Sequence, residues 1–223
     1  MRDMNRAAVV LFCGNARQEE RQKRLPHRFL ATLHDWLRRA VSAVADAELL
    51  IAACDGGRLT LRGACEGDWP AGPLDEQIER VLSFCFGSGY RRVVLLAGDV
   101  PATPRIADAL IALDAAPAVV GLSGDGGFYL AAFREEPGLD WRAILGDRKT
   151  AGRELIARLR DVAFLPTLDD IDSREDAERL LKHAPAALAS RLVPLLVPVT
   201  HPPQRTTNNE QRTTLPSRAP PAA

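Results

Sequence analysis

The sequence lacks the spacings that mark several common classes of protein. It has four cysteines and four histidines in 223 residues, but no Cys-x-x-Cys pair and no histidine near a cysteine at zinc-ligand spacing. It also has no serine nucleophile elbow, no Walker A loop and no Rossmann glycine fingerprint. These absences argue against a zinc module, a serine hydrolase, a P-loop NTPase and a Rossmann protein.

An excess of either charge is absent too. Lys+Arg and Asp+Glu both number 29, so the formal net charge is zero, and a balanced chain has no overall attraction for nucleic acid or anionic membranes. The longest late apolar run, residues 192–199, is broken by Pro194 and Pro198. It is well short of the roughly 20 residues of a membrane span. We therefore expect no nucleic-acid partner and no membrane span.

The location of the protein is predicted from its cysteines and its first residues. Cys13, Cys54 and Cys85 lie inside apolar runs, where a free thiol behaves as a small hydrophobic side chain. The N-terminal segment has neither the apolar length nor the cleavage site of a signal peptide. Both observations favour a reducing, cytoplasmic setting.

Composition divides the chain into a domain and a tail. Apolar residues make up 46% and charged residues 26%, which is ordinary for a globular protein. Half of the sixteen prolines lie at or beyond Pro185, and residues 202–223 have almost no large apolar side chain. Such a segment buries too little surface to offset its ordering entropy. We expect one folded domain over residues 7–184 and a Pro/Thr-rich, largely disordered tail over residues 185–223.

Apolar runs and helical periodicity alternate along the domain. The predicted strands are residues 8–13, 48–54, 92–97, 118–122, 128–133 and 162–165. The predicted helices are residues 29–44, 78–86, 106–113, 151–159 and 174–183, and a polar loop follows the first strand. This alternation predicts an α/β fold, with a mainly parallel sheet flanked by helices on both faces. Ligands of such sheets bind outside the carboxyl ends of the strands.

Acidic residues follow three of the predicted strands. Asp99 lies just after the clearest strand, where a carboxylate is well placed to bind Mg²⁺ beside substrate phosphates, or simply to cap the following turn. Asp125 begins an Asp-Gly-Gly turn, which allows close approach of a ligand but also makes a good hairpin. Asp169, Asp170 and Asp172 precede the last helix. One of them could reach the metal or substrate, or all could only complement the helix N-terminus.

The loop after the first strand is rich in basic residues. Guanidinium and ammonium groups there could clamp a diphosphate, although a charged loop is more often only solvated. Its basic residues are Arg17, Arg21, Lys23, Arg24 and Arg28. The histidines show no partner spacing, and we interpret them as structural or surface residues.

Three segments together resemble one bacterial family. GYRRVVLLAGDVP, VVGLSGDGGFYLAAF and LPTLDDIDSREDAERLL, in this order, resemble the DUF2064 family of glycosyltransferase-like proteins. The resemblance runs from about Val9 to Leu181 and implies the GT-A, nucleotide-diphospho-sugar transferase-like fold. It also implies a divalent cation, Mg²⁺ or Mn²⁺, and a nucleotide-sugar as ligand.

Site residues follow from the positions that match the family's motifs or lie in or beside them. The resemblance implies Asp99 and Asp125 for catalysis, Asp99 for the metal, and Lys23, Arg24, Gly98, Gly126, Gly127, Tyr129 and Asp172 for substrate and nucleotide binding. Some positions depart from the pattern: Gln22 replaces a lysine, Gly98 a serine and Gln77 an arginine, and the segment after Trp141 lacks a Trp-Ser-Thr signature.

These observations favour a glycosyltransferase-like protein that binds a nucleotide-sugar and a divalent metal at the strand carboxyl ends. Two alternatives stay open. A nucleotidyltransferase uses the same fold, although its first loop is usually rich in glycine and only Gly14 stands here. A diverged, non-catalytic member of the family is the other alternative, because fold does not fix function.

Overall fold

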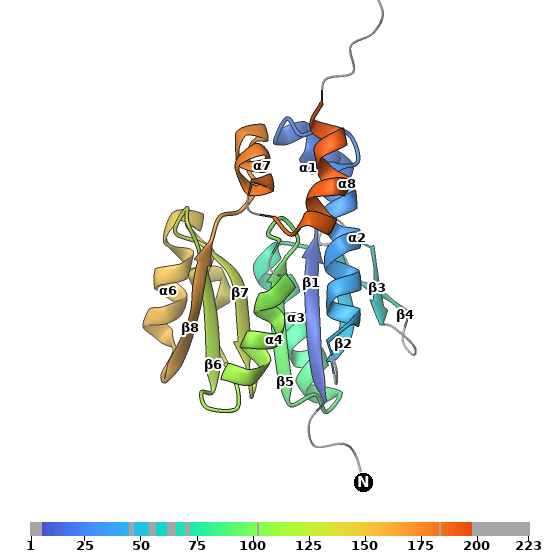
Figure 1. Ribbon diagram of the computed structural model, residues 1–223. Helices are drawn as coiled ribbons and strands as arrows, with labels where there is room; N and C mark the ends of the chain where they lie inside the picture. The colour runs from blue at the N-terminus through green and yellow to red at the C-terminus, as the bar shows by residue number, and fades with distance from the viewer. Residues whose placement is uncertain are drawn as a thin grey trace, which may run out of the picture.

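The computed structural model describes residues 6–44, 47–53, 57–61, 66–69, 72–101, 103–182 and 184–197. Its strands form one sheet in the order β4-β3-β2-β1-β5-β7-β6-β8, with helices on both faces (Figure 1). The strands are β1 (Ala7–Cys13), β2 (Ala47–Ala53), β3 (Gly57–Leu61), β4 (Glu66–Trp69), β5 (Arg92–Ala97), β6 (Ala118–Ser123), β7 (Phe128–Phe133) and β8 (Val162–Leu168). The helices are α1 (Ala16–Gln22), α2 (Phe29–Ser42), α3 (Leu74–Gly87), α4 (Thr103–Ala112), α5 (Trp141–Ile144), the 3₁₀ helix η1 (Arg148–Thr150), α6 (Ala151–Arg158), α7 (Arg174–Leu181) and α8 (Ala186–Leu196).

Most strands of the sheet run in one direction. Strand β1 pairs in parallel with β2 and β5, and β6 pairs in parallel with β8. Strand β7 is antiparallel to both β5 and β6, and β3 is antiparallel to both β2 and β4. The predicted mainly parallel α/β sheet is therefore confirmed. The carboxyl ends of β1, β5, β6 and β8 all meet at one edge, where β7 begins.

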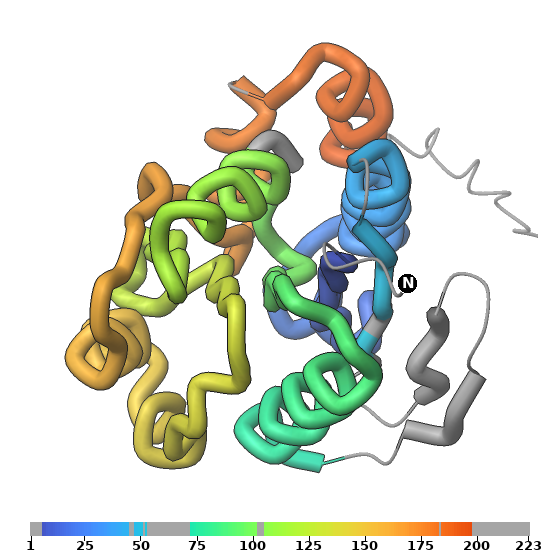
Figure 2. The backbone as a smooth tube through the Cα atoms, turned by 90° about the horizontal axis from the view of Figure 1, so that it is seen from below, coloured from blue at the N-terminus to red at the C-terminus, as the bar shows by residue number. Residues whose placement is uncertain are grey.

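The continuous apolar sequence of β1 explains its central place in the sheet. Val9 and Leu11 pack into the core on the face covered by α2, α4, α7 and α8, whereas Ala8 and Val10 pack on the face of α3, α5 and α6. Figure 2 shows these two helical layers on opposite sides of the sheet. A strand that is buried on both faces needs apolar residues at every position rather than alternation.

Helix α1 and strands β3 and β4 are among the elements that the sequence did not predict. Helix α1 occupies what we expected to be a polar loop, so that expectation is wrong. Asn15 directly precedes α1, and its side chain accepts a hydrogen bond from the Gln18 N–H at 3.2 Å. This interaction is typical of an N-cap. Strands β3 and β4 extend the sheet beyond β2 as an antiparallel pair.

The folded part extends past the predicted domain boundary at residue 184. Helix α8 buries Leu188, Leu192 and Leu196, which recur every four residues and therefore share one helix face. This face contacts α2 and α7, and Pro185 directly precedes the helix. The predicted boundary at 184 is therefore too early in the chain. The spacing of the leucines favours a helix here in spite of the prolines. Residues 198–223 lie outside the described residues.

The predicted burial of cysteines is confirmed where it is described. Cys13 and Cys85 are buried, and burial raises the pKa of the Cys85 thiol to about 12. Cys54 lies outside the described residues. Within the described ranges, no helix is both long and apolar enough to cross a membrane.

Candidate functional site

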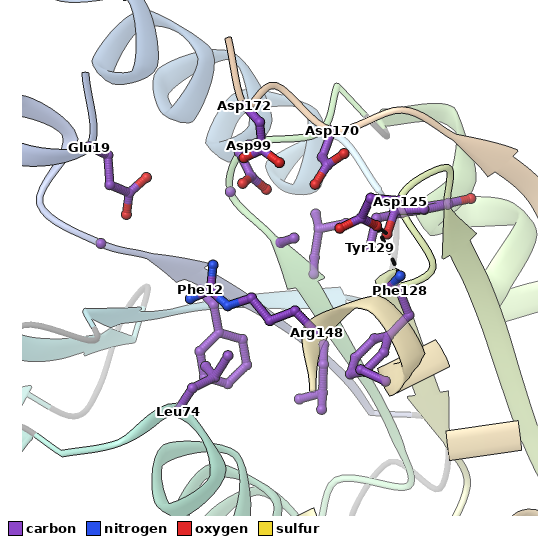
Figure 3. Close-up of a pocket in the computed structure, with 18 of the residues that line it drawn as sticks. Phe12, Glu19, Leu74, Asp99, Asp125, Phe128, Tyr129, Arg148, Asp170 and Asp172 are labelled. Carbon is purple, nitrogen blue, oxygen red and sulfur yellow. Dashed lines mark hydrogen bonds between the residues drawn. The ribbon is translucent and has the colours of Figure 1, made fainter. Parts of the chain in front are cut away.

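A cleft of about 440 Å³ opens at the carboxyl edge of the sheet. The ends of β1, β5 and β6 contribute to its lining, together with α1, α3, η1 and the segment after β8. Carboxylates gather on one side, whereas Phe12, Leu74 and Phe128 lie on the other (Figure 3). The cleft therefore has an acidic wall and an apolar wall.

Backbone contacts bring the acidic wall together. Asp99 follows β5, and its carbonyl accepts a hydrogen bond from the Ile171 N–H at 3.2 Å, which ties the end of β5 to the segment after β8. The side chain of Ile171 is fully buried, while its neighbours Asp170 and Asp172 line the cleft. Asp99, Asp170 and Asp172 place carboxylate oxygens within 4.8 Å of one another. The structure thus joins two predicted residues, Asp99 and Asp172, to Asp170, one of the open alternatives.

The surroundings of this cluster affect the ionisation of Asp170. Burial raises the pKa of Asp170 to about 6, and the negative charges of Asp172, Asp125 and Asp99 add to the effect. A bound cation would relieve this repulsion, because an opposite charge favours the ionised carboxylate.

Lys23 already provides one positive charge to this wall. Its Nζ lies 2.8 Å from Asp99 Oδ2 and 3.0 Å from Asp172 Oδ1, and it donates a hydrogen bond to the Ile171 carbonyl at 2.8 Å. Burial alone would lower the pKa of Lys23, but the two carboxylates outweigh it and raise the pKa. Lys23 is therefore an ammonium ion that bridges the ends of β5 and β8.

A buried carboxylate fixes the turn that carries Lys23. Glu20, on α1, accepts hydrogen bonds from the N–H groups of Arg28 at 3.0 Å and Leu30 at 2.9 Å, at the start of α2. This interaction satisfies N–H groups that a helix N-terminus otherwise leaves without a partner. Arg24, in the same turn, has a left-handed φ of 54°, is exposed and does not line the cleft. The structure therefore brings Lys23, but not Arg24, to the candidate site.

Asp125 lies on the cleft beside the acidic cluster. Its Oδ1 accepts hydrogen bonds from Ser123 Oγ at 2.6 Å and from the Gly127 N–H at 2.9 Å. Burial alone would raise the pKa of Asp125, but these hydrogen bonds outweigh it and lower the pKa. Asp125 is therefore a fixed, ionised carboxylate, well suited to accept hydrogen bonds from hydroxyl groups.

The glycines of the Asp-Gly-Gly turn accommodate another part of the chain. Gly126 has φ 98°, and a Cβ there would lie only 2.1 Å from the Lys149 carbonyl oxygen. The Gly152 N–H donates a hydrogen bond to the Gly126 carbonyl at 3.0 Å. Gly126 lines a separate cavity next to Lys149, whereas Gly127 lines the main cleft. The turn thus seats the 148–152 backbone at the rim of the cleft.

Two predicted residues and one histidine support the floor of the cleft. Tyr129 is buried and donates its hydroxyl to the Pro166 carbonyl at 3.0 Å, and burial raises its pKa to about 12. A Cβ at Gly98 would lie 2.7 Å from the Phe12 carbonyl oxygen, so this position has little room for a side chain. His34 packs beside Gly98; burial, and then the charge of Arg38, lowers its pKa to about 4.

Sequence reasoning missed Arg148, Phe12 and Leu74, which line the cleft. Arg148, at the start of η1, extends into the cleft between the carboxylates and Phe12 (Figure 3). It belongs to the segment that departs from the Trp-Ser-Thr signature, but this departure did not single out Arg148. Phe12, in strand β1, and Leu74, at the start of helix α3, carried no signal, since apolar residues in such elements are more often part of a core.

Part of the chain matches a known protein family. Residues 42–145 match the model of a family described as "Uncharacterized protein conserved in bacteria (DUF2064)". The predicted resemblance to DUF2064 is confirmed over these residues. No curated protein matches the chain.

Solved structures resemble this DUF2064-like chain at low identity. A protein from Desulfovibrio desulfuricans G20, described provisionally as a nucleotide-diphospho-sugar transferase, has a TM-score of 0.61 and 20% identity, over 86% of this chain and 97% of that one. A Leptospira borgpetersenii cytidylyltransferase has a TM-score of 0.47 and 11% identity, over 86% and 94%. A Mycobacterium tuberculosis H37Rv protein in complex with manganese has a TM-score of 0.42 and 15% identity, over 80% and 98%. The first comparison shows that the chain has the GT-A-like fold.

Proposed function

We propose that this protein binds a nucleotide-sugar together with Mg²⁺ or Mn²⁺ and transfers the sugar to an acceptor. The observation that carries the proposal is the convergence of Asp99, Asp170 and Asp172 at the carboxyl edge of the sheet, beside a cleft with an apolar wall. A nucleotide-sugar combines a diphosphate with a largely flat base, so it offers a charged and an apolar part to these two walls. The DUF2064 match and the GT-A-like fold agree with this class of ligand.

The donor set fits a divalent cation of this kind. Mg²⁺ and Mn²⁺ prefer carboxylate, carbonyl and water oxygens, and the carboxylate oxygens of Asp99, Asp170 and Asp172 lie within 4.8 Å of one another. We propose Asp99 as the principal ligand, supported by Asp172 and Asp170. When bound, the cation would offset the negative charge of the diphosphate that leaves the sugar.

The other cleft residues would bind and orient the donor. Lys23 Nζ lies close enough to Asp99 and Asp172 to shift its hydrogen bonds to a phosphate oxygen once a ligand enters. Asp125, with a lowered pKa, is a weak base, so we assign it to orienting sugar or acceptor hydroxyls rather than to removing a proton. Phe12 and Leu74 offer an apolar surface to the base.

The proposal is tested by the products that the purified protein releases. A panel of nucleotide-sugars is incubated with Mn²⁺ and water or simple sugars as acceptors, and the release of nucleoside diphosphate is measured. We expect release from one donor, and loss of release in Asp99→Asn. Asp35→Asn, which changes an exposed carboxylate of α2 outside the cleft, serves as the matched control.

Other products would point to the other candidate functions. Pyrophosphate released from a nucleoside triphosphate and a sugar phosphate would assign a nucleotidyltransferase instead. Metal-dependent binding of a nucleotide-sugar without any turnover would indicate a non-catalytic binding protein. If Asp99→Asn released as much diphosphate as the unchanged protein, the assignment of the acidic wall would be wrong.

A further inference from the structure

The charges that line the cleft do not balance. Among the described lining residues, acidic side chains outnumber basic ones. The acidic residues are Glu19, Asp99, Asp125, Asp170 and Asp172, and the basic ones are Lys23 and Arg148. A diphosphate that enters such a cleft meets mainly negative charge, so its binding needs cationic groups that are not already neutralised by carboxylates.

Of the two basic residues, Arg148 meets this need without first giving up a carboxylate partner. Lys23 lies within 3.0 Å of both Asp99 and Asp172, so its charge is already shared between two carboxylates. Arg148 is exposed, and within the described part of the chain its side chain forms neither an ion pair nor a hydrogen bond. Its field does reach Asp125, whose pKa it helps to lower. Arg148 therefore presents an uncommitted guanidinium to the cleft.

The backbone under Arg148 is held firmly. The Asp147 side chain accepts a hydrogen bond from the Lys149 N–H at 3.0 Å and so caps η1. The same segment packs against Gly126, where a Cβ would lie only 2.1 Å from the Lys149 carbonyl oxygen. Because this backbone is fixed, the long side chain of Arg148 starts from a defined point at the rim (Figure 3).

The Arg148 side chain points to the region between the two walls, where a ligand that contacts both walls would pass. In Figure 3, Arg148 extends across the cleft toward Phe12, below the carboxylates of Asp99 and Asp125. In a nucleotide-sugar, the diphosphate lies between the base and the sugar. A ligand with its base on the apolar wall and its diphosphate toward the acidic wall would pass the guanidinium of Arg148.

We propose that Arg148 binds the diphosphate of the donor, from the side opposite Asp99, Asp170 and Asp172. This inference rests on the proposed function and assigns the phosphate-recognising residue within it. A guanidinium forms paired hydrogen bonds with phosphate oxygens, which an ammonium cannot reproduce in the same geometry. Arg148 thus sets specificity for ligands with a diphosphate over those with a nucleoside alone.

Calorimetry with Mn²⁺-pyrophosphate tests this role without any choice of base or sugar. The full chain is compared with Arg148→Gln, Arg148→Lys and Arg142→Gln, the last being an exposed arginine of α5 that does not line the cleft. We expect Arg148→Gln to weaken pyrophosphate binding by roughly tenfold or more, the scale of a lost charge-assisted hydrogen bond. The affinity of Arg148→Lys for pyrophosphate should lie between those of Arg148→Gln and the unchanged chain. Arg142→Gln should bind pyrophosphate like the unchanged chain.

The outcomes separate this inference from the proposed function. If Arg148→Gln bound pyrophosphate as tightly as the unchanged chain while Asp99→Asn did not, the role of Arg148 would be refuted and the proposed function would stand. If the unchanged, folded chain bound neither pyrophosphate nor any nucleotide-sugar with Mn²⁺, both would be refuted. An unchanged thermal midpoint in Arg148→Gln shows that weaker binding does not come from unfolding.

Discussion

Asp170 carries a proton more readily than an ordinary aspartate because it is partly buried among other carboxylates. Its pKa is raised from 3.8 to about 6, so the folded state holds a proton that the unfolded chain releases between these values. Its contribution to stability is fully present below pH 3.8 and is lost as the pH rises through 6. At neutral pH, the ionised Asp170 therefore destabilises the fold, as residues of ligand sites often do.

Replacing Asp170 by asparagine removes this cost. We expect Asp170→Asn to raise the free energy of unfolding at pH 8 by about 1–2 kcal/mol, after allowance for solvent screening, and to change it little at pH 4. Urea unfolding at both pH values measures the difference, with the exposed neighbour Asp169→Asn as control. A gain that was equal at both pH values would contradict the explanation by ionisation.

His34 predicts a pH dependence of the opposite sign. Its pKa is lowered from 6.5 to about 4, mainly by burial, so acid favours the unfolded chain, which takes up the proton first. The stability that a neutral His34 contributes is present above pH 6.5 and is lost as the pH falls through 4. The free energy of unfolding therefore falls between pH 6.5 and pH 4. We expect this fall to be smaller by roughly 2–3 kcal/mol in His34→Gln.

The control for His34 is the exposed His27. The quantity to compare is the slope of the unfolding free energy between pH 6.5 and pH 4, since His34→Gln also changes packing. An identical slope in His34→Gln and in the unchanged protein would show that another group governs the acid response. His27→Gln should leave the slope as it is.

The seating of η1 on the Asp-Gly-Gly turn makes a prediction at the scale of an element. In Gly126→Ala, the new methyl would collide with the Lys149 carbonyl and φ 98° would be strained. Gly138→Ala is the matched control, because Gly138 also has a positive φ of 58° but open space around it. We expect the control to cost about 1 kcal/mol and Gly126→Ala more than about 3 kcal/mol by denaturant unfolding. Equal costs would mean that η1 is not fixed by this contact.

Helix α8 makes a second prediction at this scale. Leu192 is fully buried, whereas its neighbour Val193 is 46% exposed. We expect Leu192→Ala to lower the free energy of unfolding by about 2–5 kcal/mol, and Val193→Ala by no more than about 0.5 kcal/mol. Similar small effects of both changes would show that α8 does not belong to the folded domain.

The elements that the sequence could predict are those with strong apolar patterns. Strands β1 and β5 and helix α2 have continuous or periodic apolar residues, and each was found within a residue or two of its bounds. Helix α1 was missed because its sequence, ARQEERQ, has no apolar face and depends on the cap and on buried Glu20. Helix α8 was hidden by its prolines, since Pro185 directly precedes it and Pro194 lies inside it.

Some residues of the candidate site could be predicted from the sequence, and others could not. The position of Asp99 followed from its place after a strand, and Lys23 and Asp172 followed from the family resemblance, because these positions depend on chain order. Arg148 could not be predicted, since its approach to the cleft depends on how η1 packs against a distant turn. The choice among the acids after β8 likewise needed the buried side chain of Ile171 to fix which neighbours face the cleft.

At the scale of the whole molecule, the sheet decides where chemistry can occur. Strands β1, β5, β6 and β8 end at one edge, so residues far apart in sequence, such as Lys23 and Asp172, meet there. The two helical layers cover both faces of the sheet (Figure 2). The cleft opens at the carboxyl edge, between these layers. Metal, phosphate and base binding are therefore expected to be coupled within one site.

The most direct test of this claim is Mn²⁺ binding, followed by electron paramagnetic resonance of the free ion, with and without each nucleotide-sugar of a panel. We predict that one donor tightens Mn²⁺ binding, by mass action within a shared site, and that Asp99→Asn abolishes the effect while Asp35→Asn keeps it. Mn²⁺ binding that is unchanged by every donor, or equally strong in Asp99→Asn, would contradict a metal-dependent nucleotide-sugar site at this edge of the sheet.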